Sequence, residues 1–171
     1  MKKIQIIFCT LFLMAAFCSC SDRNPQNRTA NRTEKIIRNQ IKTTATGGLN
    51  VYQAFLIHQD GSLVGRDNAI KVDENAELRL YIRGWVGPDG IISLGASQNF
   101  VSDKGTVLWE EPDIFSSQGP VTVDDAQVLR LIINVGIFQP EIKHYTTQIK
   151  VWNKVNPTQS VTADVKFTIV R

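Results

Sequence analysis

Alternation of apolar and polar residues with a period of two recurs through most of the chain after residue 48, and it limits the fold more than any other feature. In Ala76–Trp85, the apolar residues Leu78, Leu80 and Ile82 alternate with charged and aromatic residues. This is the pattern of a strand with one buried face. The turn sequence Gly87–Gly90 then separates this strand from the next one.

Seven further segments share this alternation and are bounded by turn residues: 49–58, 92–100, 106–109, 121–123, 129–135, 143–152 and 161–170. No convincing helix of ten residues or more is found. Runs of short strands with turns between them predict an all-β fold, an antiparallel sandwich or barrel of seven to eight strands over residues 49–171. A domain of this size buries roughly two-thirds of its unfolded surface, so it needs no disulfide.

The N-terminus has the features of a secretory signal. Lys2 and Lys3 precede the apolar run 4–17, which at about 1.5 Å per residue is shorter than the ~30 Å hydrocarbon core of a bilayer. It therefore predicts a signal peptide and no transmembrane helix. All three cysteines, Cys9, Cys18 and Cys20, lie in the first twenty residues, which leaves the rest of the chain without thiol chemistry.

The end of the apolar run, Phe17-Cys18-Ser19-Cys20, resembles the lipobox of bacterial lipoproteins, although Phe17 and Cys18 depart from its usual residues. The resemblance implies a signal peptide over residues 1–19 and lipidation of Cys20. Cys18 is the alternative, but Phe17 before it suits a signal peptidase poorly. Ser21 after the cysteine implies sorting to the outer membrane, and the incomplete acidic run that follows favours its periplasmic face. A lipid-anchored chain stays outside the bilayer.

Residues 20–48 are rich in Asn, Arg, Thr and Gln and lack aromatic residues, which predicts a flexible tether. This segment carries six basic and two acidic side chains, whereas residues 49–171 carry 11 basic and 14 acidic ones. A basic tether beside an anchor is suited to anionic lipid headgroups. Within it, Thr33–Lys42 has the spacing of a short helix, but we favour a solvated linker for this stretch.

Several function classes lack the residues that they need. The chain has 19 Lys and Arg against 16 Asp and Glu, a balance that argues against nucleic-acid binding. Its only histidines, His58 and His144, are far apart, and no G-x-S-x-G motif occurs. The acidic clusters 110–113, 124–125 and 73–74 lie beside turns and lack calcium-loop spacing. We therefore predict a protein that is not an enzyme and uses no metal or cofactor.

The strand region contains Gly84-Trp85, Leu94-Gly95-Ala96, Asp103-Lys104-Gly105, Asp124-Asp125-Ala126 and Val151-Trp152-Asn153-Lys154. With these features it resembles a group of uncharacterised small lipoproteins of Bacteroidetes-type bacteria over most of residues 50–170. The resemblance implies an immunoglobulin-like β-sandwich and an envelope location. It implies no catalytic residues.

Outward positions on two strands predict a binding patch. If the apolar rows of these strands face the core, then aromatic, basic and amide side chains face outward. The candidate residues are Arg79, Tyr81, Arg83, Trp85, Gln148, Lys150 and Trp152. Residues of these types dominate binding hot spots and also stack on sugar rings. A loop over Trp85, or strands that are not neighbours, would remove the patch.

These features together predict an outer-membrane lipoprotein whose domain is a non-catalytic protein-binding or assembly module of an envelope complex, such as a secretion-system lipoprotein. A glycan- or peptide-binding accessory lipoprotein is the alternative, and a periplasmic hydrolase is the third class. The expected partners are the membrane, through the lipid anchor, and an envelope protein or glycan.

Overall fold

The structure is a computed structural model that describes residues 35–72, 74–134 and 142–170. Residues 33–171 form one compact unit. The signal-peptide and lipidation predictions (residues 1–19 and Cys20) and Asp73 of one acidic cluster lie outside the described residues. Within the described ranges, no helix has the length and apolarity needed to cross a membrane.

Nearly all of the regular structure is β-strand. In chain order the strands are β1 (Ile36–Ile37), β2 (Lys42–Ala45), β3 (Asn50–His58), β4 (Ala69–Lys71), β5 (Asn75–Arg83), β6 (Ile91–Ile92), β7 (Leu94–Ser102), β8 (Val107–Glu111), β9 (Val121–Thr122), β10 (Val128–Asn134), β11 (His144–Asn153) and β12 (Ser160–Val170). Two 3-10 turns, η2 (Pro88–Gly90) and η3 (Asp125–Gln127), complete the described elements.

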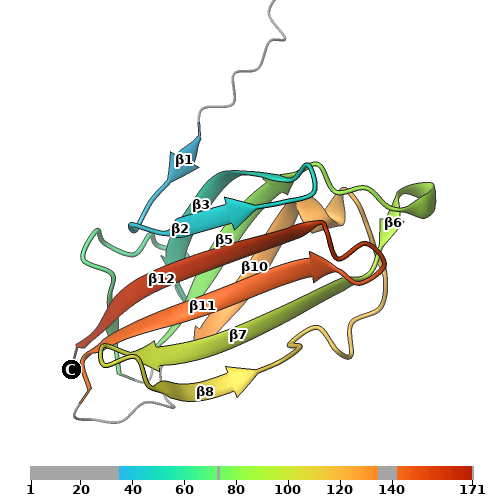
Figure 1. Cartoon of the computed structure of the whole chain (residues 1–171). Helices are drawn as coiled ribbons and strands as arrows, with labels where there is room; N and C mark the ends of the chain where they lie inside the picture. Colours follow the sequence, from blue (N-terminus) through green and yellow to red (C-terminus); the bar gives the residue numbers. More distant parts are fainter. Residues whose placement is uncertain (1–34, 73, 135–141, 171) are drawn as a thin grey trace, which may run out of the picture. The chain divides into compact units, whose positions relative to one another are not determined.

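The long strands form two sheets. Sheet A has the order β1-β3-β5-β10, and sheet B has the order β2-β12-β11-β7-β8, with β4 beside one end of β12. In Figure 1, β12, β11, β7 and β8 run across the front, and β3, β5 and β10 lie behind them. The pairing is antiparallel except where β1 joins β3 and β4 joins β12. The all-β, antiparallel sandwich predicted from the alternation is therefore confirmed.

The core lies between the sheets and is made of the predicted inward rows. Leu78, Leu80 and Ile82 of β5 are each fully buried, and so are Val151, Val161 and Val165 of sheet B. Burying a side chain of this kind contributes about 1.5–3 kcal/mol. A polar bond also joins the layers, because the Gln98 side chain on β7 donates to the Ile132 carbonyl on β10 over 3.3 Å.

The domain begins earlier than predicted, so the boundary at residue 48 is wrong. Part of the expected tether pairs with both sheets: β1 lies parallel to β3, and β2 lies antiparallel to β12. Neither the solvated linker favoured for Thr33–Lys42 nor the helical alternative is found where the structure describes this stretch, because β1, a turn and the start of β2 occupy it.

A buried amide explains how so polar a segment folds. Asn39 is 8% exposed, and its amide nitrogen donates to Gly65 O and to Asn68 Oδ1, while its oxygen accepts the Leu56 N–H. Asn68, which is 3% exposed, donates in turn to Lys166 O on β12. Such bonds stabilise a segment that has little apolar surface to bury.

Candidate functional site

The predicted patch does not exist as one surface, because its two strands lie in different sheets. Arg79, Tyr81 and Arg83 are on β5 of sheet A, whereas Gln148 and Lys150 are on β11 of sheet B. Outward side chains of two packed sheets face opposite sides of a sandwich. Apart from Trp85, the inward–outward assignment on each strand is correct, but the two strands are not neighbours.

Trp85 is also misplaced in the prediction, because it is 3% exposed and belongs to the core. Gly84 before it has φ of +96°, and a Cβ there would lie 2.4 Å from Gly48 O. The left-handed backbone at Gly84 ends the alternation of β5, so the next side chain turns inward. The Gln159 side chain holds this bend through bonds with Gly84 O and the Val86 N–H.

The outward side of sheet A carries what we call the arginine–aromatic face. Its members are aromatic, basic or aliphatic side chains on β3, β5 and β10: Tyr52, Phe55, Arg79, Tyr81, Arg83, Val128, Arg130 and Ile132. Cross-strand pairing sets them in rows, with Arg79 between Phe55 and Arg130 and with Tyr81 opposite Val128. Ile132 is 52% exposed, a large fraction for an isoleucine.

The aromatic residues of this face pack against one another. The Tyr81 ring lies 5.9 Å from the Tyr52 ring and 5.8 Å from the Phe55 ring, between centroids. The Arg83 guanidinium lies 4.2 Å from the centre of the Tyr52 ring, a cation–π arrangement. A bulge between Val51 and Gln53 sets Tyr52 beside these partners. These contacts hold the large side chains in place before any partner binds.

One ion pair belongs to the arginine–aromatic face. A guanidinium nitrogen of Arg79 lies 2.7 Å from a carboxylate oxygen of Glu77 two residues away. The hydrogen bond to Glu77 raises the pKa of Arg79 above its ordinary value, against the opposing effect of burial. Glu77 therefore neutralises one arginine of the face.

The outward side of sheet B carries a polar face. It consists of hydroxyl, amide and charged side chains with one tryptophan: Lys42, Ser97, Asn99, Glu110, Thr146, Gln148, Lys150, Trp152, Thr162, Asp164 and Lys166. One row of Cα partners crosses five strands in the order Lys42, Asp164, Gln148, Asn99 and Glu110. Three of the predicted patch residues, Gln148, Lys150 and Trp152, belong to this face.

Part of the polar face is hollowed. A groove of about 790 Å³ runs over β12, β11 and the end of β7, and its lining includes Lys42, Gln148, Asp164 and Lys166. In the part of the chain that the structure describes, the side chains of Lys42, Gln148 and Asp164 form no hydrogen bond or ion pair with another residue. Their donors and acceptors are available to a ligand.

Trp152 lies outside this groove on the same strand face. A Cβ built on Gly95, its cross-strand partner, would lie 2.4–2.8 Å from three indole atoms. The indole therefore lies over the backbone of β7 in space that only a glycine leaves.

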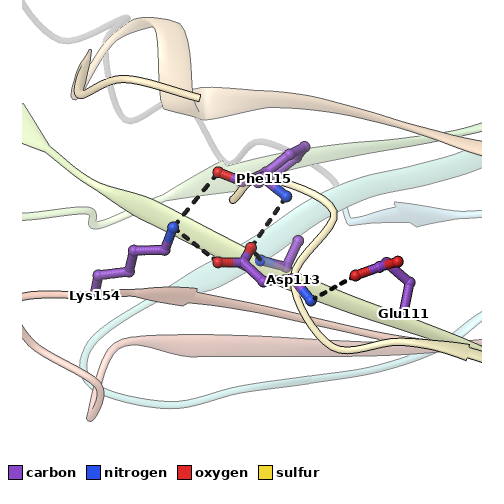
Figure 2. A network of polar contacts seen from close by, with 5 residues as sticks. Glu111, Asp113, Phe115 and Lys154 are labelled. Carbon is purple, nitrogen blue, oxygen red and sulfur yellow. Dashed lines mark hydrogen bonds and ion pairs between the residues drawn. The ribbon is translucent and has the colours of Figure 1, made fainter. Parts of the chain in front are cut away.

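The loop after β8 is held in place by Asp113, whose bonds with Lys154 and Phe115 are drawn in Figure 2 and which also binds the N–H of Ala96. Lys154 Nζ lies 2.8 Å from the Asp113 carboxylate, whose other oxygen accepts the N–H groups of Ala96 and Phe115, each over 3.0 Å. Burial acts to raise the pKa of Asp113, but the bonds from Lys154, Ala96 and Phe115 outweigh it and hold that pKa below its ordinary value. The carboxylate is thus a structural group.

The remaining acidic and histidine candidates also have structural contacts. Asp125 accepts the Thr122 hydroxyl over 2.7 Å, and Asp124 accepts the Gln127 amide over 2.9 Å. His58 Nδ1 lies 2.9 Å from a Glu74 carboxylate oxygen, and His144 is an exposed residue at the start of β11. Among the described residues, no group of three or more His, Cys, Asp or Glu side chains is arranged to hold a metal ion.

The prediction missed Tyr52, Phe55, Arg130 and Ile132 on one face and Lys42 and Asp164 on the other. A signal for most of them was present, because the alternation in 49–58, 129–135 and 161–170 marks their positions as outward. Lys42 carried no such signal, because its segment looked like a tether.

Comparison with known proteins supports the fold. No protein-family model matches the chain, and no curated protein matches it. The solved structure of the C-terminal domain of Wzt is similar, with a TM-score of 0.52 and 7% sequence identity over 81% of this chain and 82% of that one. The PmoD soluble domain from Methylocystis sp. (Rockwell) matches with a TM-score of 0.37 and 13% identity, over 74% and 96% of the two chains. At 7% identity, the likeness to the Wzt domain is one of β-sandwich fold.

Proposed function

We propose that this protein is an outer-membrane lipoprotein, anchored through Cys20, whose β-sandwich is a non-catalytic protein-binding module of an envelope complex. The anchor and the location rest on the N-terminal sequence, with its basic start, short apolar run and Cys20 at a lipobox-like position. The resemblance to Bacteroidetes-type envelope lipoproteins supports the same location. The periplasmic face of the membrane is the preferred side.

The observation that carries the binding role is the composition of the arginine–aromatic face. Tyrosine and arginine are enriched where interfaces bind most strongly, and aliphatic neighbours exclude water around them. Here Tyr81 is packed by two other rings, and Val128, its cross-strand partner on β10, is 37% exposed. Side chains that are already ordered lose little entropy on binding.

The test is crosslinking in intact cells followed by purification of the protein under denaturing conditions. The native chain is compared with Cys20→Ala, with the double variant Tyr81→Ala/Arg83→Ala, and with Gln148→Ala/Lys150→Ala on the polar face as the matched control. We expect a stoichiometric envelope protein with the native chain and the control, and its loss from the other two. Capture that is unchanged in Tyr81→Ala/Arg83→Ala would remove the arginine–aromatic face as the interface.

A further inference from the structure

We infer that the polar face binds an uncharged oligosaccharide, which lies along the groove over β11 and β12 and stacks on Trp152. This site is separate from the arginine–aromatic face and does not rest on the proposed function. The chemistry of the groove lining, the position of Trp152 and one unpaired buried atom support it independently.

The lining of the groove suits a ligand rich in hydroxyl groups. Lys42, Gln148 and Asp164 present amine, amide and carboxylate groups that have no side-chain partner among the described residues. A few convergent polar groups in a hollow of several hundred cubic ångströms are typical of a small-ligand site. Sugars both donate and accept hydrogen bonds, and this mixture of groups matches both roles.

The charge of the groove argues against an anionic polymer. Its lining holds two lysines, Lys42 and Lys166, and three aspartates, Asp67, Asp103 and Asp164. Binding to a phosphate or uronate chain needs an excess of positive charge. An uncharged ligand fits this near balance.

The place of the groove in the sheet argues against a peptide. Extended peptides add to a free sheet edge or fill apolar pockets. Here β12 is paired on both sides, with β2 and β11, and β11 is paired with β12 and β7. Tyr145 and Phe167 also line the groove, but their side chains are buried in the core, and Val101 is the remaining apolar residue of the lining within the described chain. The free edge of this sheet is at β2, to the side of the groove floor on β11 and β12, and most exposed side chains over that floor are polar.

Trp152 supplies the stacking platform. It lies four residues after Gln148 on β11, which is about 13 Å along the strand at ~3.4 Å per residue. One face of its indole covers Gly95, so the other face points away from the sheet. The electron-rich face of an indole attracts the C–H groups on the apolar side of a sugar ring.

Asn99 lies next to the groove on the same face, although it is not one of the lining residues. Its Oδ1 atom is buried, yet it accepts no hydrogen bond within the described residues. The residue stands directly opposite Gln148 in the pairing of β7 with β11. A buried acceptor without a partner costs about 1–3 kcal/mol, which a bound water or ligand hydroxyl would relieve.

The experiment is binding of the full-length protein to an array of uncharged gluco-, manno-, xylo- and N-acetylglucosamine oligosaccharides, followed by titration with each sugar that is retained. We expect Trp152→Ala to weaken binding about tenfold, the factor that corresponds to about 1.4 kcal/mol. Trp152→Phe, which keeps an aromatic ring over Gly95, and Gln148→Ala/Asp164→Ala separate stacking from hydrogen bonding. Gln59→Ala, in the exposed turn after β3 and outside both faces, is the control and leaves affinity within about twofold.

Two results would overturn the inference. One is that no uncharged oligosaccharide on the array is retained, or that only anionic glycans or peptides are. The other is retention that Gln148→Ala/Asp164→Ala and Trp152→Ala do not change while both remain folded by circular dichroism. Loss of the envelope protein in the crosslinking test leaves this result untouched, because that test depends on the other sheet.

Discussion

The two outward faces of the sandwich are built on the same alternation but differ in how their side chains are engaged. On the arginine–aromatic face, Tyr81 contacts two rings and Arg79 is paired with Glu77. On the polar face, Gln148 and Asp164 have no side-chain partner within the described residues. The first surface is ordered by its own contacts, as protein interfaces often are. The second leaves its hydrogen-bonding groups available, as a site for a polar ligand does.

We expect the largest effect from the loss of Asn39, whose side chain links sheet A to sheet B. Asn39→Ala deletes the bonds from the Asn39 side chain to Leu56, Gly65 and Asn68 and leaves buried polar groups unpaired. We expect the free energy of unfolding to fall by about 3 kcal/mol. Urea unfolding followed by circular dichroism measures it.

Asn39 also has φ of +56°, so alanine adds backbone strain of about 1 kcal/mol. Asn39→Gly is the control, because it loses the same bonds without that strain. A loss below about 1 kcal/mol in both variants would mean that Asn39 does not hold the sheets.

Tyr81→Ala tests the arginine–aromatic face alone. It removes the ring that contacts both Tyr52 and Phe55. We expect affinity for the crosslinked partner to fall by about 2 kcal/mol, roughly thirtyfold, as for other hot-spot tyrosines. Tyr81→Phe keeps the ring and separates packing from the hydroxyl. Equal losses in Tyr81→Ala and in Gln148→Ala would erase the distinction between the two faces.

Gly95→Ala tests the polar face alone. Its new Cβ would lie 2.4 Å from an indole carbon of Trp152, so the ring must move away from β7. We expect a loss of about 2 kcal/mol in unfolding free energy, the usual cost of overpacking, and weaker sugar binding. Ser97→Ala, on the same strand and face, is the control. An unchanged stability in Gly95→Ala would contradict the packing of Trp152 on this glycine.

Asp113→Asn tests the loop that borders the polar face. Because folding lowers the pKa of Asp113, its carboxylate stabilises the native state above the unfolded pKa of about 3.9, and this stability is lost as pH falls through the folded pKa. We expect Asp113→Asn to cost about 1.5 kcal/mol at neutral pH.

Unfolding of the native chain and Asp113→Asn as a function of pH measures this effect. The difference between the two should shrink as the solution is acidified and vanish below the folded pKa. Lys154→Met is the companion variant, since it removes the cation and leaves the carboxylate. A difference that is constant with pH would assign the effect to packing instead of charge.

Glu77→Gln should have the smallest effect. The Arg79–Glu77 pair is partly exposed, with 24% and 21% of the two side chains accessible. Such pairs contribute little, so we expect about 0.5 kcal/mol, and less at high salt. The same change leaves Arg79 without its neutralising partner. We therefore expect the free energy of partner binding to change more than the free energy of unfolding. A larger change in the free energy of unfolding would show that the ion pair stabilises the fold and plays no part in binding.

The fold was largely predictable because alternation is a local property. The alternation in residues 76–82 and 161–167 shows which side chains face inward, and these side chains form the core. The pairing of strands is not local. The sequences of β5 and β11 do not indicate that β5 lies between β3 and β10 or that β11 lies between β12 and β7. The single patch was therefore wrong even though the outward assignments on both strands were right except for Trp85.

Two other errors have a common cause. Trp85 was assigned outward from the alternation of its strand, and the segment that holds β1 and β2 was assigned to a tether from its composition. Their positions depend on backbone geometry instead: the positive φ at Gly84 turns Trp85 inward, and the Asn39 turn folds polar residues onto both sheets. Single residues with an unusual backbone conformation determine where these side chains and strands lie. The alternation of apolar and polar residues does not reveal such conformations.

The turn at Asn39 also determines where a force on the N-terminal part of the chain would act on the domain. A pull on the chain before residue 35 first meets β1, which pairs with β3 at only two residues. It then meets Asn39, which is bonded to Leu56 N on β3 and, through Asn68, to Lys166 O on β12. The force therefore acts on both sheets at once and does not separate a single terminal strand from its neighbour. If the chain is anchored through Cys20, as we propose, a pull from the membrane would reach both sheets at this turn.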